Sequence, residues 1–332
     1  MKRALIVSLV FALAAPLAVA APPTIGELLR LVPESARVVV AVDSAALRDA
    51  PKVQAWLLHH QAWTGADENL RQFLADAGLD PVRDVDAMVV AVLGEGSATG
   101  GVALFAGRYD PTSLAAALVK RGAKPFTVGS VPAFTLPANE DHRGKSAVLA
   151  QPSPDLVLVG DDAAVRAALN APHAVIPLVE QEVAAGHIDL RAPFWVVAVV
   201  PAEARAHAAE AAGRAHGEDS GPMQSVVIAS GTVQRVALQA FLDDSLKLSG
   251  VARADTPENA ELLRDAAKGA LAVARLHAQQ QSPELVGVLR DVQVVQSGSE
   301  VSVSGSVPLA LLEKLIAEHK AMHGSVSKEP VR

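Results

Sequence analysis

The sequence predicts an α+β protein made of two related units, each a mainly antiparallel sheet covered by helices on one face. Residues 38–42 and 194–200 are apolar, mostly β-branched runs, and each leads directly into a helical pattern. In both halves the later strand patterns are mostly joined by short turns that contain glycine or proline, which is typical of hairpins. The repeated order of patterns, rather than residue identity, predicts the duplication.

The predicted domain organisation follows the same patterns. Residues 1–20 are a signal peptide, and residues 21–172 form the N-terminal unit. A connector with one short helix occupies residues 173–192. Residues 193–323 form the C-terminal unit, and residues 324–332 are a loose tail.

Helix starts are well marked in the N-terminal unit. Asp110 and Pro111 provide a cap and a first-turn proline, and Gly78 suits the residue that follows a helix ending at Ala77. The predicted strands are 38–42, 85–93, 101–108, 125–128, 131–136, 146–150 and 155–160. Helices are predicted at 25–31, after Ser44, after Pro51, and at 67–77, 111–121 and 161–170.

In the C-terminal unit, Thr256, Pro257 and Glu258 predict a helix start, since they supply a cap, a first-turn proline and an acid at the positive helix end. Valines and serines alternate from 301 to 307, which predicts a strand with one wet face. The predicted strands are 194–200, 224–230, 233–242, 246–253, 285–296 and 299–307, the last two forming a hairpin across Gly298. The predicted helices are 177–185, 201–213, 257–280 and one that opens at Pro308.

The first twenty residues have the three parts of a secretory signal. Lys2 and Arg3 precede an apolar run, and Ala18 and Ala20 provide small residues before cleavage at Ala21. The apolar part is shorter than the roughly 20 residues that span a bilayer. We therefore expect a periplasmic or secreted protein without a stable membrane span.

Composition excludes several classes of function. Loss of the signal, with its two basic residues, changes the formal net charge from −7 to −9, and an acidic protein is repelled by nucleic acid. The absence of cysteine excludes disulfides, thiolate metal sites and cysteine nucleophiles. The three tryptophans lie beside apolar residues and are expected in the core. Scarce aromatic residues disfavour sugar binding.

No motif predicts a catalytic or cofactor site. The glycine-rich segment 94–101 is followed by a strand instead of the helix that would hold a phosphate, so it is expected to be a hairpin loop. The acidic pairs Asp161–Asp162 and Asp243–Asp244 are expected to cap a helix or shape a turn. We therefore predict no catalytic residue and no cofactor.

Three histidine groups have weak metal-ligand spacing. His319 and His323 lie four residues apart on the last predicted helix, and Glu203 and His207 share a helix face with Glu210. The third group is the adjacent pair His59 and His60, whose side chains point in different directions. The expected alternative for each is an ordinary solvated surface.

Residues 32–43 (VPESARVVVAVD) resemble the opening of a broad group of exported bacterial proteins of unknown function. In that group a Pro-x-[Ser/Asp] turn leads into a hydrophobic strand that ends in aspartate. Residues 78–85 and the helix–hairpin–helix unit from Thr256 to Leu315 are similar too. The resemblance implies a repeated α+β exported protein and no catalytic residues. Many of those proteins carry a membrane anchor, whereas this sequence shows only a cleaved signal.

The leading hypothesis is a non-enzymatic binding protein that holds a periplasmic protein or a small apolar ligand in a groove between the two units. One alternative is a metal-assisted hydrolase that uses a histidine–carboxylate cluster such as Glu203 and His207. Another is an envelope scaffold that self-associates through exposed sheet edges.

Overall fold

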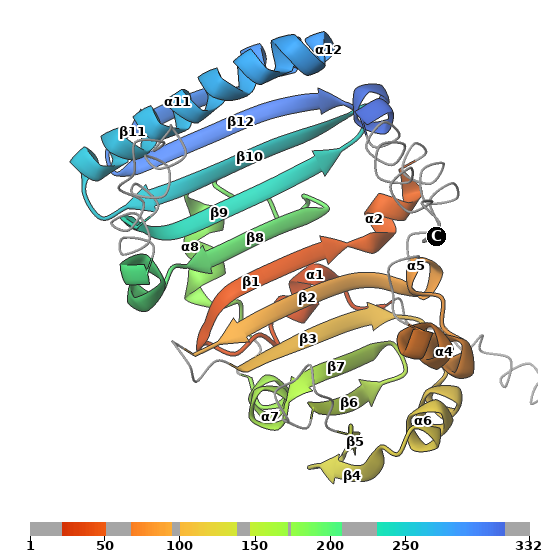
Figure 1. Cartoon of the computed structure of the whole chain (residues 1–332). Helices are drawn as coiled ribbons and strands as arrows, with labels where there is room; N and C mark the ends of the chain where they lie inside the picture. Colours follow the sequence, from red (N-terminus) through yellow and green to blue (C-terminus); the bar gives the residue numbers. More distant parts are fainter. Residues whose placement is uncertain are drawn as a thin grey trace, which may run out of the picture.

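The computed structural model describes residues 22–50, 68–94, 100–137, 147–171, 174–207 and 231–315. It confirms the α+β class: one large antiparallel sheet carries the helices (Figure 1). The strands of both predicted units join in a single twelve-stranded sheet with the order β11-β12-β10-β9-β8-β1-β2-β3-β7-β6-β5-β4. Among the described residues, no helix combines the length and hydropathy needed to cross a membrane.

The strands agree closely with the sequence patterns. They are β1 (Ala36–Asp43), β2 (Val85–Leu93), β3 (Gly100–Gly107), β4 (Lys124–Val128), β5 (Val131–Thr135), β6 (Ala147–Ser153), β7 (Leu156–Asp161), β8 (Phe194–Val199), β9 (Val233–Leu242), β10 (Ser245–Ala254), β11 (Gln293–Ser297) and β12 (Glu300–Pro308). The predicted strand 224–230 lies outside the described residues.

Most helices begin at the expected signals, whereas the helices Pro81–Asp84 and Pro283–Asp291 are not predicted by the sequence patterns. The helices are α1 (Ile25–Leu29), α2 (Ser44–Asp49), α4 (Glu68–Ala77), α5 (Pro81–Asp84), α6 (Pro111–Lys120), α7 (Asp162–Leu169), α8 (Pro177–Ala184), α11 (Pro257–Gln281) and α12 (Pro283–Asp291). The Asp110 carboxylate accepts hydrogen bonds from the first turn of α6, and Thr256 does the same for α11. The predicted helix after Pro51 lies outside the described residues.

The centre of the sheet is the antiparallel pair β1 and β8, in which Val40 lies opposite Val196. On each side of this pair the chain makes a three-strand meander, β1-β2-β3 or β8-β9-β10. After the meander the chain leaves the sheet through helical structure and later returns to it. In the N-terminal half the returning strand β7 pairs with β3, and in the C-terminal half β12 pairs with β10. That the two units are related remains a prediction.

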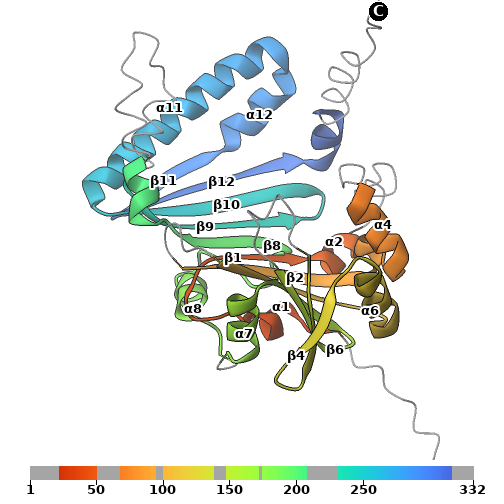
Figure 2. The same cartoon turned by 60° about the horizontal axis from the view of Figure 1, so that its bottom comes forward.

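Helices pack on both faces of the sheet, and not on one face as the sequence pattern predicts (Figure 2). The face that carries Val39 and Trp195, called the α8 face here, packs against α1, α7 and α8 and encloses the main core. The opposite face, called the α11 face, is covered by α4 and α6 at one end and by α11 and α12 at the other. The difference arises because β3 is apolar on both sides: Leu104 and Phe105 point to opposite faces and both need cover.

The connector belongs to the core. Ile176, Val179 and Ile188 are buried in the main cluster on the α8 face, where α8 packs on β8. The predicted connector therefore packs in the main core of the sheet.

The predicted strand 285–296 is wrong over its first part. Residues 283–291 form α12, and only Gln293–Ser297 pairs with β12. Pro283 occupies the first helical turn, and the apolar residues Leu285, Val286 and Leu289 follow with a spacing that suits one helix face. An apolar run of this length fits either a short helix or a strand, and packing against α11 favours the helix.

Gly160 of β7 allows a close approach between β7 and β3. A Cβ atom at this position would overlap the carbonyl oxygen of Gly101 and would lie 2.9 Å from Cα of Val102. We expect Gly160→Ala to lower the free energy of unfolding by about 1–3 kcal/mol, because the two strands must separate to admit the methyl group. Urea denaturation measures the change.

The matched control is Gly269→Ala on α11, where a Cβ would meet no atom within 4 Å. This change is expected to leave stability unchanged or to raise it by up to about 1 kcal/mol, since alanine is the better helix former. Equal unfolding midpoints for Gly160→Ala and the parent chain would contradict the close approach.

Candidate functional site

Of the predicted metal ligands, Glu203 and His207 lie in the described part of the chain. Both are exposed, one turn apart on the helical residues 202–207 that follow β8. The described ranges contain no group of three or more His, Asp or Glu residues that could hold a metal ion. His319 and His323 lie outside the described residues, as do the other histidine candidates and Glu210.

The acidic pairs have structural partners. Asp161 occupies the N-cap position of α7, but its side chain makes no capping hydrogen bond and instead accepts one from the Gly101 N–H at 2.8 Å. Asp162 pairs with Arg166 one turn along α7. Asp243 accepts a hydrogen bond from the Ser245 N–H in the turn between β9 and β10.

The remaining sequence features are also structural where they are described. The glycine-rich segment leads into β3, which begins at Gly100, so no helix follows it. Trp195 is fully buried in the main core. Trp56 and Trp63 lie outside the described residues.

The α11 face carries an unbroken apolar surface across the centre of the sheet. Cross-strand register places aliphatic, Phe, Met or Gly residues at the central positions of this face from β12 through β2. We call this surface the apolar face; its central residues are Val301, Val303, Gly305, Val307, Leu246, Leu248, Gly250, Ala252, Val236, Leu238, Ala240, Leu242, Phe194, Val196, Ala198, Val38, Val40, Val42, Met88, Val90 and Val92.

The apolar face is only partly covered. Leu238 of β9, Leu248 of β10 and Val303 of β12 retain 36%, 40% and 38% of their surface exposed. Gly250 lies between Leu238 and Val303 and contributes no side chain to the surface. Among the described helices none packs broadly on β9, and Figure 1 shows β8, β9, β1 and β2 in open view between α11 and α4. Contiguous exposed apolar surface of this kind marks binding sites.

A partly buried ionic network lies on the opposite, α8 face. The carboxylate of Glu182 on α8 is buried and accepts a hydrogen bond from Arg235 of β9 at 2.9 Å. Its second oxygen lies 2.7 Å from Nδ1 of His187. Nε2 of His187 faces Glu300 of β12 at 3.4 Å, and Glu300 pairs with Arg253 of β10. The network therefore ties α8 to three strands of the C-terminal half.

Charge pairing determines the protonation of this network. Burial raises the pKa of Glu182, but hydrogen bonds from His187 and Arg235 outweigh it and hold that pKa below its ordinary value. The hydrogen bond to Glu300 raises the pKa of the Arg253 guanidinium, against a smaller effect of burial. Glu182 is therefore ionised at neutral pH.

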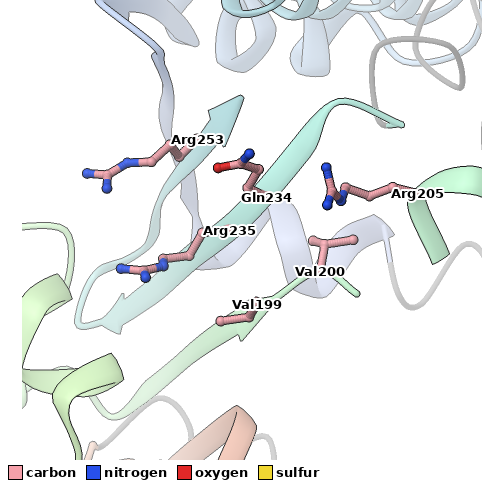
Figure 3. A pocket seen from close by; sticks show the side chains of 6 residues that line it. All are labelled: Val199, Val200, Arg205, Gln234, Arg235 and Arg253. Carbon is pink, nitrogen blue, oxygen red and sulfur yellow. The ribbon is translucent and has the colours of Figure 1, made fainter. Parts of the chain in front are cut away.

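A cavity of about 250 Å³ lies where β8 ends and β9 continues beside it. Figure 3 shows three arginines around it: Arg205 extends from the helical segment after β8, and Arg235 and Arg253 extend from β9 and β10. Gln234 and the end of β8, Val199 and Val200, complete the lining. The Arg235 and Arg253 side chains point away from Arg205 (Figure 3), and they pair with Glu182 and Glu300.

Sequence reasoning misses the ionic network and the cavity. Glu182 lies in the predicted connector, Arg205 in a predicted surface helix, and Glu300 at the start of a strand more than one hundred residues away. No spacing rule relates such positions, because only the cross-strand register of β9, β10 and β12 brings them together. One local signal is present: Arg235 and Arg253 interrupt strands that are otherwise mostly apolar.

Comparison with known proteins gives no functional assignment. No family model matches the chain, and no curated protein matches it. Among solved structures, crystal forms I and IV of TP0453 resemble it, with TM-scores of 0.44 and 0.43 and sequence identities of 8% and 9%. Each alignment covers 87% of this chain and 96% or 95% of TP0453. Likeness at this level supports neither a shared fold nor a shared role.

Proposed function

We propose that this chain is an exported, non-enzymatic binding protein that holds an aliphatic ligand on the apolar face. The observation that carries the proposal is the exposure of Leu238, Leu248 and Val303 in the middle of a wholly apolar sheet surface. An exposed apolar patch lowers solubility unless something covers it, and burial of each Å² of apolar surface contributes about 25 cal/mol.

The chemistry of the surface favours an aliphatic occupant. Its side chains are valine, leucine, alanine, methionine and one phenylalanine, so they offer no hydrogen-bond donor or acceptor. The backbone groups of these central strands are paired with neighbouring strands. A sugar or nucleotide would lose hydrogen bonds to water here without replacement, whereas a hydrocarbon chain loses none.

Export is supported by the sequence of residues 1–20 and by the resemblance of residues 32–43 to exported bacterial proteins. An aqueous compartment outside the cytoplasm is a setting in which aliphatic molecules need a carrier, since water excludes them. The binding role and the predicted location therefore agree with each other.

The test is displacement of a fluorescent apolar probe from the chain that begins at Ala21. N-phenyl-1-naphthylamine is expected to brighten on binding and to be displaced by dodecanol. Leu238→Glu and Leu248→Glu should each weaken dodecanol binding by about tenfold or more, because each places a charge where the hydrocarbon lies. Both positions are exposed enough to accept glutamate without loss of the fold.

Val119→Glu is the matched control, since Val119 is an aliphatic residue with 52% exposure on α6, away from the apolar face. It should leave dodecanol binding unchanged. Loss of binding that is equal in all three variants, or no probe binding by the folded parent chain, would refute the proposal. A concentration-dependent dimer that excludes the probe would show that a second copy covers the face instead.

A further inference from the structure

We infer that α11 carries an interaction surface for a second copy of this chain, in an antiparallel helix pair with Gly269 at its two-fold axis. The surface is called the outward stripe here and consists of Leu262, Gly269 and Leu276. It lies on the side of α11 that faces away from the sheet. The inference therefore does not depend on what binds to the apolar face.

The two leucines provide the first observation. Leu262 and Leu276 are 57% and 60% exposed, and these are the highest values for large apolar side chains among the described residues. Ala260, on the opposite side of the helix, is fully buried in a cluster with Ala254 and Val301. Figure 2 shows the sheet and α12 on one side of α11. The outward stripe is thus an exposed apolar surface on the other side.

Gly269 provides the second observation. It lies in the interior of a 25-residue helix, where glycine is less favourable than alanine. Packing within the described part of the chain does not require a glycine here, since a Cβ would meet no atom within 4 Å. A glycine on an outward helix face allows the backbone of another helix to approach closely.

The spacing of the three residues indicates which partner fits. Leu262 and Leu276 lie seven residues before and seven residues after Gly269, which is close to two turns each way, so all three share one face. In an antiparallel pair of identical helices centred on Gly269, each Leu262 lies opposite Leu276 of the second copy. The outward stripe is therefore complementary to itself under a two-fold rotation, as a symmetric dimer requires.

The surroundings of the stripe suit such a contact. Ala272 and Val273 lie beside Gly269 on the outward side. Asp265 lies at the border, and its carboxylate is already paired with Arg264 of the same helix at 2.8 Å. Antiparallel alignment also places opposite ends of the two helix dipoles side by side. Because the contact involves one helix from each copy, it is small, and we expect a weak, reversible dimer.

Sedimentation equilibrium of the chain that begins at Ala21 tests the surface. We expect monomer at about 1 μM and a substantial fraction of dimer at about 1 mM. Leu262→Glu and Leu276→Glu should each weaken association by about tenfold or more, because the two-fold axis places each new charge in the contact twice. Val119→Glu, at an exposed valine of α6, is the matched control and should leave association unchanged.

Single cysteines test the antiparallel geometry, since the chain has no cysteine of its own. Gly269→Cys should form a disulfide between two copies under mild oxidation, because the two-fold axis brings the two side chains together. Leu262→Cys alone should not, because its two copies lie about 21 Å apart along the helices. A mixture of Leu262→Cys and Leu276→Cys should cross-link.

A chain that stays monomeric up to about 1 mM would overturn the inference. A dimer that Leu262→Glu and Leu276→Glu leave unchanged would overturn it too, as would equal cross-linking of Leu262→Cys alone and Gly269→Cys. The dimer formed through α11 should still bind N-phenyl-1-naphthylamine, because the outward stripe faces away from the sheet. Failure of the monomer to bind that probe would count against the apolar face and not against this surface.

Discussion

Trp195→Ala is expected to lower the free energy of unfolding by about 3–5 kcal/mol, as large-to-small changes of buried aromatic residues do. Trp195 is the largest fully buried side chain of the described residues. It lies on the α8 face of β8, opposite Ala41 of β1 and Gln239 of β9. Alanine here would leave a cavity at the strand pair that joins the two halves of the sheet.

Urea denaturation followed by circular dichroism measures this loss. Trp195→Phe is the informative comparison, because it retains most of the ring volume and removes an Nε1–H that has no hydrogen-bond partner in the described residues. We expect it to cost much less than alanine. If Trp195→Ala lowered the free energy of unfolding by less than about 1 kcal/mol, the effect of an average substitution, the role of this residue at the β1–β8 strand pair would be contradicted.

Glu182→Ala is expected to lower the free energy of unfolding by a similar amount, about 3–5 kcal/mol. Removing one partner of a buried ion pair leaves the other partner buried without a counter-charge. Glu182 retains 3% of its surface exposed and is the shared partner of His187 and Arg235. The His187 and Arg235 side chains are themselves mostly buried, so water replaces the carboxylate poorly.

Glu182 also gives a pH dependence with a defined sign. Its pKa in the folded chain lies below the ordinary value of 4.5. A depressed carboxyl pKa contributes stability that is fully present above the unfolded-state pKa and is lost as pH falls through the folded-state pKa. Glu182→Gln should therefore remove part of the fall in stability below about pH 4.5. Urea midpoints measured from pH 7 down to pH 3 test this, and parallel curves for parent and variant would refute it.

Strand patterns were sufficient for most of the fold because apolar periodicity directly reflects burial. The spans of β2 and β9 match the predicted ranges, and the alternation of Val301 and Ser302 correctly separates the two faces of β12. Periodicity does not show what covers a face. Val301 and Val303 lie on the same face of β12 by alternation, yet Val301 is buried under α11 and Val303 is exposed.

The candidate sites were much harder to predict from the sequence than the strands. Sequence reasoning favours side chains that are close in the chain, such as Glu203 and His207, and these remain on an exposed helix surface. The arginine cavity is assembled by the register between β9 and β10, which places Arg235 directly opposite Arg253. A shift of one residue in that register would send the two side chains to opposite faces.

Photolabelling tests the central claim most directly. The chain that begins at Ala21 would be irradiated with a diazirine-bearing long-chain alcohol, and labelled peptides would be identified by mass spectrometry. We predict labels within β9, β10 and β12, including the peptides that carry Leu238 and Leu248, and competition by excess dodecanol. Labels concentrated on α6 or spread evenly over the surface, with no competition, would contradict an aliphatic site on the apolar face.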